Sequence, residues 1–524
     1  MSLWRNRGTK LLCAALCIAL LAPLFSQSTA RAASPPPIGI YLDGKKIVSD
    51  VPPYMIPKEN VTMVPLSVIS KSLGARVDWS QPAKTVTIRH EGLVLQMTMG
   101  QKHALVNGQR TELETTVQVV NGRVMVPLRF VGTQLKLLVT WQQASRTILL
   151  QSENGESENE ESLRGAWVST VYNLDWPSDK SYGQAEKQKQ EYVQLLDELQ
   201  GMGMNAVFVQ VRPSADSLYP SKLVPWSRYL QGKQGADPGY DPLAFMIEET
   251  HGRGMEFHAW FNPFRATVDG KSDALAPNHV ALAHPEWIVL AGGKHYLNPG
   301  IPEARQHIID AVMEVVEGYD IDGVHLDDYF YPSGTAFPDD TAYAAYNPGK
   351  LNNKADWRRD NINRFVKELG EAIRRAKPQL KFGISPFGVW RNIADDPTGS
   401  DTRAGVTTYD SMYADVRTWI RQGWIDYVAP QIYWSLSFEA ARYDKLVDWW
   451  ANEVRGTGVE LLIGHAPYKI GTKEAGWNTA QEIIDQLNYN RGVIEVQGDI
   501  FFSAKDLRRN PLGLIPLLQQ YYQR

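Results

Sequence analysis

The sequence predicts a (β/α)8 barrel preceded by a small duplicated α+β domain, and three observations support this fold class. From residue 164 onward, eight short apolar runs alternate with amphipathic stretches of helical length. The preceding segment contains a repeat at a constant offset of 62 residues, and an acidic stretch separates the two parts. Eight strands separated by helices within about 360 residues are typical of a closed parallel barrel.

Residues 1–33 have the pattern of a signal peptide. A positive stretch with Arg5, Arg7 and Lys10 precedes an apolar core of about 15 residues, and "ARA" at 30–32 fits a signal-peptidase site. The core is shorter than the roughly 20 residues that a membrane span needs. We therefore expect a secreted protein, extracellular or cell-wall associated, with no membrane span after signal removal. An uncleaved N-terminal anchor is the alternative.

The composition is that of an ordinary folded protein. The formal net charge of -4 gives no support for a nucleic-acid partner or for binding to anionic membranes. Both cysteines, Cys13 and Cys17, lie in the signal segment, so the mature chain has none. Its core must therefore provide the stability without disulfides.

Residues 34–151 contain the internal repeat. "VTMVPLSVISKSLGARVDWSQPAKTVTI", from Val61, aligns with "RVMVPLRFVGTQLKLLVTWQQASRTILL", from Arg123. Each unit predicts a strand, a short amphipathic helix that begins at the Pro-Leu pair, and a hairpin that carries a tryptophan. We expect the paired Trp79 and Trp141 to pack in the core.

This half resembles the copper amine oxidase N-terminal-like domain that recurs in exported bacterial proteins. The resemblance covers about 115 residues and depends on the duplicated "VPL" pattern. The segment offers only His90 and His103 and no clustered ligands, so we expect neither a metal nor a cofactor. We interpret it as a spacer or attachment module, with the cell wall as its partner.

An acidic linker follows the module. "SENGESENEES", from Ser152 to Ser162, contains five Glu among its 11 residues and no apolar residue, which is typical of a solvated, flexible segment. We therefore expect a linker at 152–163 and a separate barrel domain at 164–524.

The barrel elements follow in order. The predicted strands lie at 164–170, 205–211, 255–261, 322–328, 381–387, 427–434, 460–468 and 499–506. The predicted helices lie at 186–200, 241–253, 303–317, 357–376, 410–422, 438–454, 478–490 and 511–523. A doubly wound open sheet is the alternative, but no glycine-rich phosphate loop follows the first strand, as a dinucleotide-binding domain would require.

Polar and aromatic side chains gather at the predicted strand ends, where barrels of this kind build their sites. Buried polar groups need partners, so polar residues at nearly every strand end are hard to explain as packing. Tryptophan and tyrosine residues in the same loops favour a sugar ligand, because flat rings match the apolar faces of pyranoses.

Several motifs together carry a resemblance to a known family. "RGAWVSTVYNLDWP", "FHAWFNPFR", "DGVHLDDYFYP", "FGISPFGVWRN" and "GWIDYVAPQIYW" resemble the bacterial glycosyl-hydrolase-like family ten. The resemblance implies a (β/α)8 glycoside hydrolase that acts outside the cell on a polysaccharide, with a cell-wall or other amino-sugar glycan as a plausible substrate.

The fourth strand can be compared with the alpha-amylase pattern, in which a basic residue lies two positions before the nucleophilic Asp. His325 and Asp327 occupy those positions, and alternation along the strand directs both side chains to the barrel interior. Asp328 is a second acid, a sugar ligand or a cap. We predict Asp327 and Asp328 as catalytic. The predicted substrate-binding residues are Trp167, Gln210, Arg212, His258, Trp260, Asn262, His325, Tyr329, Trp390, Gln431, Tyr433, Trp434 and His465.

Two mechanisms remain open. A two-carboxylate mechanism needs a further acid, and the fifth strand, "GISPFG", offers none. Substrate-assisted hydrolysis uses the N-acetyl group of the sugar itself. For it, "QIYW" resembles the chitinase-type strand with an orienting tyrosine, here Tyr433. The loop candidates for a further acid are Asp395, Asp396, Glu439, Glu474 and Asp506.

Two other functions compete with hydrolysis. A metal-dependent polysaccharide deacetylase would need an Asp and two His that bind a metal ion, which activates water, and His258, His325 and His465 are on different predicted strands that could bring them together. A non-catalytic carbohydrate-binding barrel would bind sugar through the same mouth without cleaving it.

Overall fold

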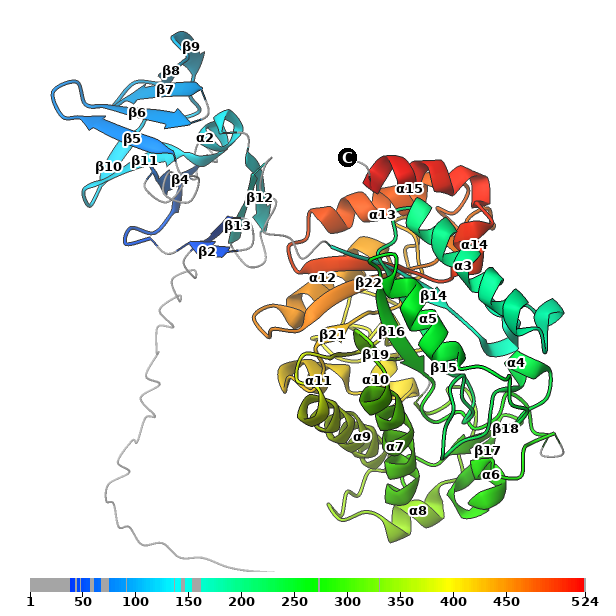
Figure 1. Ribbon diagram of the computed structural model, residues 1–524. Coiled ribbons are helices and arrows are strands. Elements are labelled where there is room, and N and C mark those ends of the chain that lie inside the picture. The colour runs from blue at the N-terminus through cyan, green and yellow to red at the C-terminus, as the bar shows by residue number, and fades with distance from the viewer. Residues whose placement is uncertain are drawn as a thin grey trace, which may run out of the picture. The chain divides into compact units, whose positions relative to one another are not determined.

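The computed structural model divides the chain into two compact units, Met1–Gly155 and Glu156–Arg524 (Figure 1). The predicted signal peptide and most of the predicted linker lie outside the described residues. The structure describes residues 38–42, 45–47, 49–56, 61–66, 75–90, 92–135, 137–142, 147–152, 162–271, 274–328 and 330–522.

The second unit is a closed barrel of eight parallel strands, and the predicted fold class is confirmed. Neighbouring strands pair in chain order, and the first strand pairs with the last. The strands are β14 (Leu163–Val168), β15 (Ala206–Arg212), β16 (Glu256–Phe261), β19 (Gly323–Leu326), β20 (Lys381–Ile384), β21 (Tyr427–Val428), β22 (Glu460–His465) and β23 (Val496–Phe501).

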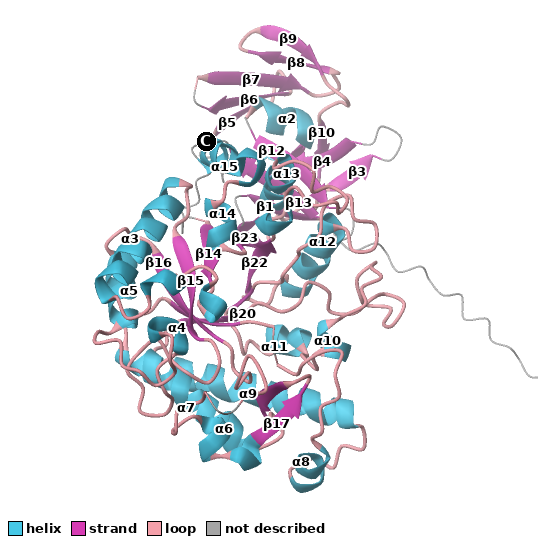
Figure 2. Cartoon of the chain, turned by 90° about the vertical axis from the view of Figure 1, so that its right-hand side faces the viewer, coloured by secondary structure: helices cyan, strands magenta, loops and turns pink. Residues whose placement is uncertain are grey.

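A helix follows each of these strands and lies on the outside of the barrel (Figure 2). These helices are α3 (Ala185–Gly201), α5 (Pro242–His251), α7 (Pro302–Gly318), α9 (Lys354–Ala376), α11 (Val416–Arg421), α12 (Tyr443–Val454), α13 (Gln481–Arg491) and α15 (Leu514–Tyr522). The loops add shorter elements, namely α4 (Arg228–Gln231), α6 (Val280–Ala283), the hairpin β17 (Ile288–Ala291) and β18 (Lys294–Leu297), α8 (Asp340–Ala345), α10 (Thr408–Ser411) and α14 (Ala504–Arg508).

The single helix predicted at 410–422 is wrong. The segment forms α10 and α11, and Tyr413 between them has a φ of 55°. This left-handed conformation cannot continue a right-handed helix. Asp415 then begins the second helix, because its side chain accepts the backbone N–H of Thr418.

Strand alternation gives the barrel two apolar layers. On β15, Phe208 faces the lumen, and it packs there with Trp167, Trp260 and Tyr427. The flanking Val207 and other residues of opposite parity pack against the surrounding helices. The lumen is therefore filled with side chains, and its C-terminal end is where polar groups can reach solvent.

The first unit has internal two-fold character. β4 (Val61–Pro65) and β11 (Arg123–Pro127) are equivalent strands of the two repeats, and they pair with each other in antiparallel orientation. Val64 lies opposite Val126, its counterpart at the offset of 62. The duplicated α+β domain is thus organised around the contact between its own copies.

Three sheets make up this module. β4 and β11 form one with β3 (Tyr54–Ile56) and β10 (Gln118–Val120). A second has the order β12 (Leu137–Gln142), β13 (Thr147–Ser152), β1 (Gly39–Leu42), β2 (Lys45–Ile47). The third has the order β5 (Arg76–Ser80), β6 (Thr85–His90), β7 (Leu93–Thr98), β8 (His103–Val106), β9 (Gln109–Glu112).

The predicted helix of the second repeat is α2 (Leu128–Gln134), whereas residues 67–74 of the first repeat lie outside the described part. The expected core position of Trp79 is wrong, because its side chain is 38% exposed on the edge strand β5. Its indole N–H donates to Gln81 Oε1 at 2.7 Å. The side chain of Trp141 lies outside the described part.

None of the helices in the described part of the chain combines the length and the apolar content of a membrane span.

We expect Gly323→Ala to destabilise the barrel. An added Cβ would lie 2.1 Å from His258 Nδ1, and the His258 ring is fixed because it stacks on Phe208 at 4.3 Å. Overpacking of this kind costs about 1–3 kcal/mol, so the melting temperature by circular dichroism should fall by several degrees. Gly405→Ala is the control, since nothing lies within 4 Å of its added Cβ. Equal melting temperatures of the two variants would contradict the packing described here.

Candidate active site

Asp327 and Asp328 lie at the C-terminal end of β19, at the mouth of the barrel. The four residues of this strand are buried, and the two aspartates that follow are 5% and 7% exposed. The apolar strand therefore holds two carboxyl groups almost out of water, where an unpaired charge is expensive.

A chain of hydrogen bonds leads to Asp327 from the loop after β14. The backbone N–H groups of Thr170 and Val171 donate to Gln210 Oε1 at 3.0 and 2.9 Å. Because this oxygen accepts both, the amide of Gln210 is fixed, and its Nε2 donates to Asn262 Oδ1. Asn262 Nδ2 then donates to Asp327 Oδ2. Each group in this relay donates towards the carboxylate.

The direction of the relay favours a negative charge on Asp327. A carboxylate that accepts an N–H is stabilised in its ionised form, and such charge-assisted bonds are stronger than neutral ones. Gln210 and Asn262 are 1% and 0% exposed, so water does not compete for these bonds. We predicted both as sugar contacts, but the structure places them beneath the carboxylate as its support.

Asp328 has the opposite character. Burial raises its pKa to about 7, and the negative charge of Asp327 adds to this effect. A hydrogen bond from Gln431 and the charge of Arg265 lower the pKa in part. Gln431 also donates from Nε2 to the backbone oxygen of Ser385 at 3.1 Å, which orients its amide at the mouth. The surroundings of the two neighbouring carboxyl groups thus favour different states: the relay favours the ionised form of Asp327, and burial favours the protonated form of Asp328.

The predicted sugar contacts Trp167 and His325 lie lower, in the lumen, and bond to each other. Trp167 Nε1 donates to His325 Nε2 at 3.0 Å, and an indole N–H can only donate. The proton of the imidazole is therefore on Nδ1, which donates to Tyr427 Oη at 2.9 Å. Burial holds the pKa of His325 well below its ordinary value, so the ring is neutral. Both ring nitrogens have protein partners, and the prediction of a ligand contact is corrected for both residues.

His258 lies near the N-terminal end of the lumen and not at the mouth. Its ring stacks on Phe208, and its Nε2 lies 2.9 Å from the carboxylate of Glu256, the first residue of β16. The prediction that His258 faces the lumen is confirmed, but the predicted position at the C-terminal end of the barrel is wrong. Alternation determines which side chains point inward but not how far along the barrel they lie.

Arg212 lies outside the lumen because the register shifts between Gln210 and Arg212. Gln210 pairs with Trp260, which faces the lumen, whereas Arg212 pairs with Phe261, which faces the helices. The guanidinium is fully buried there, and its Nη1 donates to the backbone oxygen of Asn262 at 2.9 Å. The predicted place of Arg212 beside the aspartates is wrong.

His465 also faces the helices. Its Nδ1 lies 2.9 Å from Gln486 Oε1 of α13, and its Nε2 lies 2.7 Å from Asp499 Oδ1. On β22 it is Leu462 that faces the lumen, and His465, of opposite parity, points away from it. The prediction of a sugar contact is therefore wrong for this residue.

Trp390 and Trp260 are both 5% exposed, and neither offers an open ring face. Trp390 stacks on Trp449 of α12 at 5.7 Å, and the guanidinium of Arg417 lies 4.4 Å from its ring centre, so it belongs to the helical layer. Trp260 belongs to the lumen cluster below the mouth. Tyr329 lies outside the described residues.

An aromatic group stands at the ends of the last three strands. Tyr433, Tyr468 and Phe502 lie with ring centres 6.0 to 6.3 Å apart. Tyr468 is 42% exposed, and Tyr433 and Phe502 are half-buried. We call these three residues the aromatic wall. Tyr433 was predicted, whereas Tyr468 and Phe502 were missed, although both follow directly on apolar strands in "GHAPY" and "IFFS".

Trp434, the other predicted aromatic contact of this strand end, is half-buried. Its ring meets Phe387 edge-on at 5.8 Å. An added Cβ at Gly388 would lie 2.8 Å from the Trp434 ring, so the glycine allows the indole to lie close to the loop after β20.

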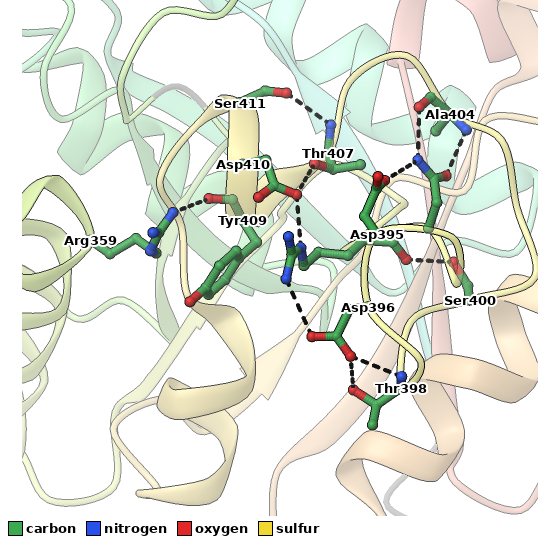
Figure 3. A network of polar contacts seen from close by, with 12 residues as sticks. Arg359, Asp395, Asp396, Thr398, Ser400, Ala404, Thr407, Tyr409, Asp410 and Ser411 are labelled. Carbon is green, nitrogen blue, oxygen red and sulfur yellow. Dashed lines mark hydrogen bonds and ion pairs between the residues drawn. The ribbon is translucent and has the colours of Figure 1, made fainter. Parts of the chain in front are cut away.

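The loop acids that were candidates for a further catalytic group have structural partners. Asp395 accepts from Asn392 Nδ2 at 3.1 Å, and Asp396 accepts from Arg391 and from Thr398 (Figure 3).

Two other candidates from the sequence are engaged in the same way. The carboxylate of Glu474 pairs with Lys469 at 2.9 Å, and Asp506 lies 3.5 Å from Arg509. Glu439 is exposed. The described contacts therefore bring none of these five candidates to the aspartate pair.

Asp175 is a carboxyl group that the sequence reasoning missed. It accepts the backbone N–H groups of Ser169 and Lys505 at 2.7 and 2.6 Å and the hydroxyl of Ser503 at 2.7 Å. Burial raises its pKa to about 6. The residue ties the loop after the first strand, which begins the relay, to the segment after the last strand.

Within the described ranges, no three His, Cys, Asp or Glu side chains are grouped as a metal site would require. His258, His325 and His465 lie at the base of the lumen, below the mouth and outside the barrel, respectively. The geometry that a metal-dependent deacetylase would need is therefore missing from these three histidines.

Comparison with known proteins agrees with this architecture. Residues 162–479 match the family model described as glycosyl hydrolase-like 10, and residues 41–150 match the copper amine oxidase N-terminal domain. The chain is 55% identical over 366 residues to glycosyl hydrolase YngK of Bacillus subtilis strain 168, covering 69% of this chain and 71% of that protein.

A second relative is glycosyl hydrolase DigH of Escherichia coli strain K12. It is 44% identical over 375 residues, covering 67% of this chain and 85% of that protein. The model match covers most of the barrel, and both relatives are far above chance similarity. The chain belongs to the glycosyl hydrolase-like 10 family.

Proposed function

We propose that the protein is an exported glycoside hydrolase that cleaves an amino-sugar polysaccharide such as a cell-wall glycan. One observation carries the proposal, namely the pair of buried carboxyl groups at the barrel mouth, of which Asp327 accepts the hydrogen bond of the relay and Asp328 has a raised pKa. Glycosidic cleavage requires one group that donates a proton and another that stabilises the positive charge of the transition state. Asp328 is the proton donor, and the carboxylate of Asp327 stabilises the charge.

In the first step, Asp328 gives its proton to the glycosidic oxygen as the bond from that oxygen to the anomeric carbon breaks. The positive charge that develops on the sugar is stabilised by the carboxylate of Asp327, which the relay keeps ionised. Asp328 is then a carboxylate and accepts a proton from the water that completes hydrolysis.

The nucleophile in this scheme is the N-acetyl carbonyl oxygen of the substrate. It bonds to the anomeric carbon as the leaving group departs, and water later breaks that bond. Two observations favour this route over a second enzymic carboxylate. Four of the five loop acids have partners elsewhere, and the Asp327–Asp328 pair is contiguous in the chain. In this proposal Tyr433, in the aromatic wall, orients the acetamido group.

Export and attachment complete the proposal. The N-terminal segment has the signal-peptide pattern, and the duplicated module would hold the enzyme at the cell wall. A non-catalytic sugar-binding barrel is the second candidate. The buried aspartates argue against it, because a binding site gains nothing from a carboxyl group whose burial raises its pKa to about 7.

We expect the full chain to release new reducing ends from purified peptidoglycan or N-acetylated chito-oligosaccharides. Asp328→Asn should lower kcat by about 10²- to 10⁴-fold, because it removes the proton donor. The wild-type rate should fall as pH rises through about 7, where Asp328 loses its proton. De-N-acetylated chito-oligosaccharides should not be cleaved. Sugar binding without any release of reducing ends would contradict hydrolysis, and cleavage of the de-N-acetylated substrate would contradict substrate assistance.

The same variant should be more stable than the wild type at alkaline pH. The folded-state pKa of Asp328 lies above the ordinary value of 3.8, so folding favours the protonated form, and stability falls as pH rises from about 4 to about 7. Asn cannot ionise and escapes this loss. The melting temperature of Asp328→Asn relative to the wild type should therefore be higher at pH 7.5 than at pH 4 and should not rise further above pH 7.5. If the difference in melting temperature between the variant and the wild type is the same at both pH values, the burial of this carboxyl group is contradicted.

Gln210→Glu tests the relay without changing shape. A carboxylate at this position accepts the two backbone N–H groups but has no N–H for Asn262, so the Asn262 amide would turn and present its oxygen to Asp327. We expect a 10- to 100-fold lower kcat and an acid limb of the pH profile displaced to higher pH, because a bond to a charged group contributes about 1.5–3 kcal/mol. The surface variant Gln422→Glu is the control. An unchanged pH profile would exclude the relay.

Tyr468→Ala tests the aromatic wall. One stacking ring contributes about 0.5–1.5 kcal/mol of binding free energy. Its loss should raise KM about three- to tenfold and leave kcat and the pH profile nearly unchanged. Tyr346→Ala removes a similarly exposed ring, 38% against 42%, in a different loop and should have no effect. If both variants behave alike, the wall does not contact substrate.

A further inference from the structure

The N-terminal module carries a hollow on the outer face of its five-stranded sheet. The hollow has a volume of about 350 Å³, which is within the range of small-ligand sites. Four of the five strands contribute to it. Its lining residues are Ser80, Ala83, Thr85, Thr87, Gln96, Thr98, Gln101, His103 and Leu105.

This hollow is not a by-product of the duplication. The hairpins β1–β2 and β8–β9 precede equivalent strands in the two repeats, yet they join their sheets differently. β1 pairs directly with β13, whereas β8 is separated from β6, the counterpart of β13, by the extra strand β7. The five-stranded sheet is wider by this strand, which provides Gln96 and Thr98 to the hollow.

The extra strand has one apolar and one polar face. Leu95 and Met97 are fully buried in the core of the module, while Gln96 and Thr98, which alternate with them, are half-buried in the hollow. The buried Leu95 and Met97 account for the stability of β7. Gln96 and Thr98 on the opposite face are not required for packing and are therefore available for a ligand.

The chemistry of the lining suits an uncharged, hydroxyl-rich ligand. None of the lining residues is Lys, Arg, Asp or Glu, and His103 is the one titratable side chain among them, so the hollow has no permanent charge for a nucleic acid, a phosphate or a peptide terminus. The hydroxyls of Thr85 and Thr98 lie 2.8 Å apart, and Gln96 Nε2 lies 3.5 Å from Thr87 Oγ1. Hydroxyl and amide groups provide both donors and acceptors, as sugar hydroxyls require.

An apolar contact lies in the same hollow. Leu105 is 36% exposed on β8, beside the polar side chains of the lining. A pyranose ring presents an apolar face and a polar rim, and Leu105 with the surrounding hydroxyls matches that combination.

We infer that this hollow is a second glycan-binding site that holds a neutral stretch of polysaccharide, separate from the cleavage site in the barrel. The choice of glycan over another neutral ligand rests on the proposed function. Such a site would keep the enzyme on an insoluble substrate between cleavage events, because linked binding sites raise the effective concentration of substrate.

The test is co-sedimentation of the full chain with purified peptidoglycan sacculi, in the Asp328→Asn background so that the substrate persists. Thr87→Val and Thr98→Val remove hydroxyls at nearly constant shape, and Gln96→Ala removes the amide. We expect the triple variant to need at least a tenfold higher sacculus concentration for half-maximal sedimentation. Thr111→Val, on β9 of the same sheet and outside the hollow, is the control.

A second measurement separates the two proposals. In the chain with Asp328 intact, the triple variant should cleave a soluble N-acetylated trisaccharide at the wild-type rate and should keep the wild-type melting temperature. Sedimentation equal to that of the control overturns the inference, even if cleavage occurs. Weakened sedimentation in a chain that cleaves nothing supports the second site and overturns the proposed hydrolysis.

Discussion

A buried carboxylate must receive hydrogen-bond donors, and the surroundings of Asp327 are arranged to meet this requirement. The backbone N–H groups of Thr170 and Val171 fix the amide of Gln210, which in turn fixes Asn262 and delivers an N–H to Asp327. The direction of this hydrogen-bond relay is set by the backbone N–H groups, because a backbone N–H can only donate. Burial raises the pKa of the neighbouring Asp328, and a negative charge held on Asp327 by the relay adds to this effect.

The sequence predicted the barrel and the position of Asp327 and Asp328 at its mouth, because apolar period and strand ends are local properties. It did not predict which other strand-end residues share that mouth. Arg212 left the lumen through a one-residue register shift, which no local pattern reveals. His465 had the wrong parity, and His258 had the right parity at the wrong depth. Depth depends on the stagger between strands, which only the closed sheet determines.

The tryptophans show the same limit in another way. Trp390, expected to face sugar, packs with Trp449 and Arg417, whereas Trp79, expected in a core, is exposed on an edge strand. A large aromatic ring can lie in a core or on a surface, so the residue type alone does not determine where a tryptophan lies. The duplicated module adds a further case, since the repeat predicted two equal units and the structure has an extra strand, β7, in only one of the sheets.

The family match ends at residue 479, but the barrel does not. β23 is the second neighbour of β14, and Asp175 bonds to Ser503 across 328 positions of the chain. A growing polypeptide that ends before β23 already contains Asp327 and Asp328, but on an open sheet with two free edges. Such distant contacts form slowly, and here they require β23, which is synthesised after every other strand of the barrel. The order of synthesis therefore leaves the carboxyl pair without its final surroundings until β23 has been made and has closed the barrel.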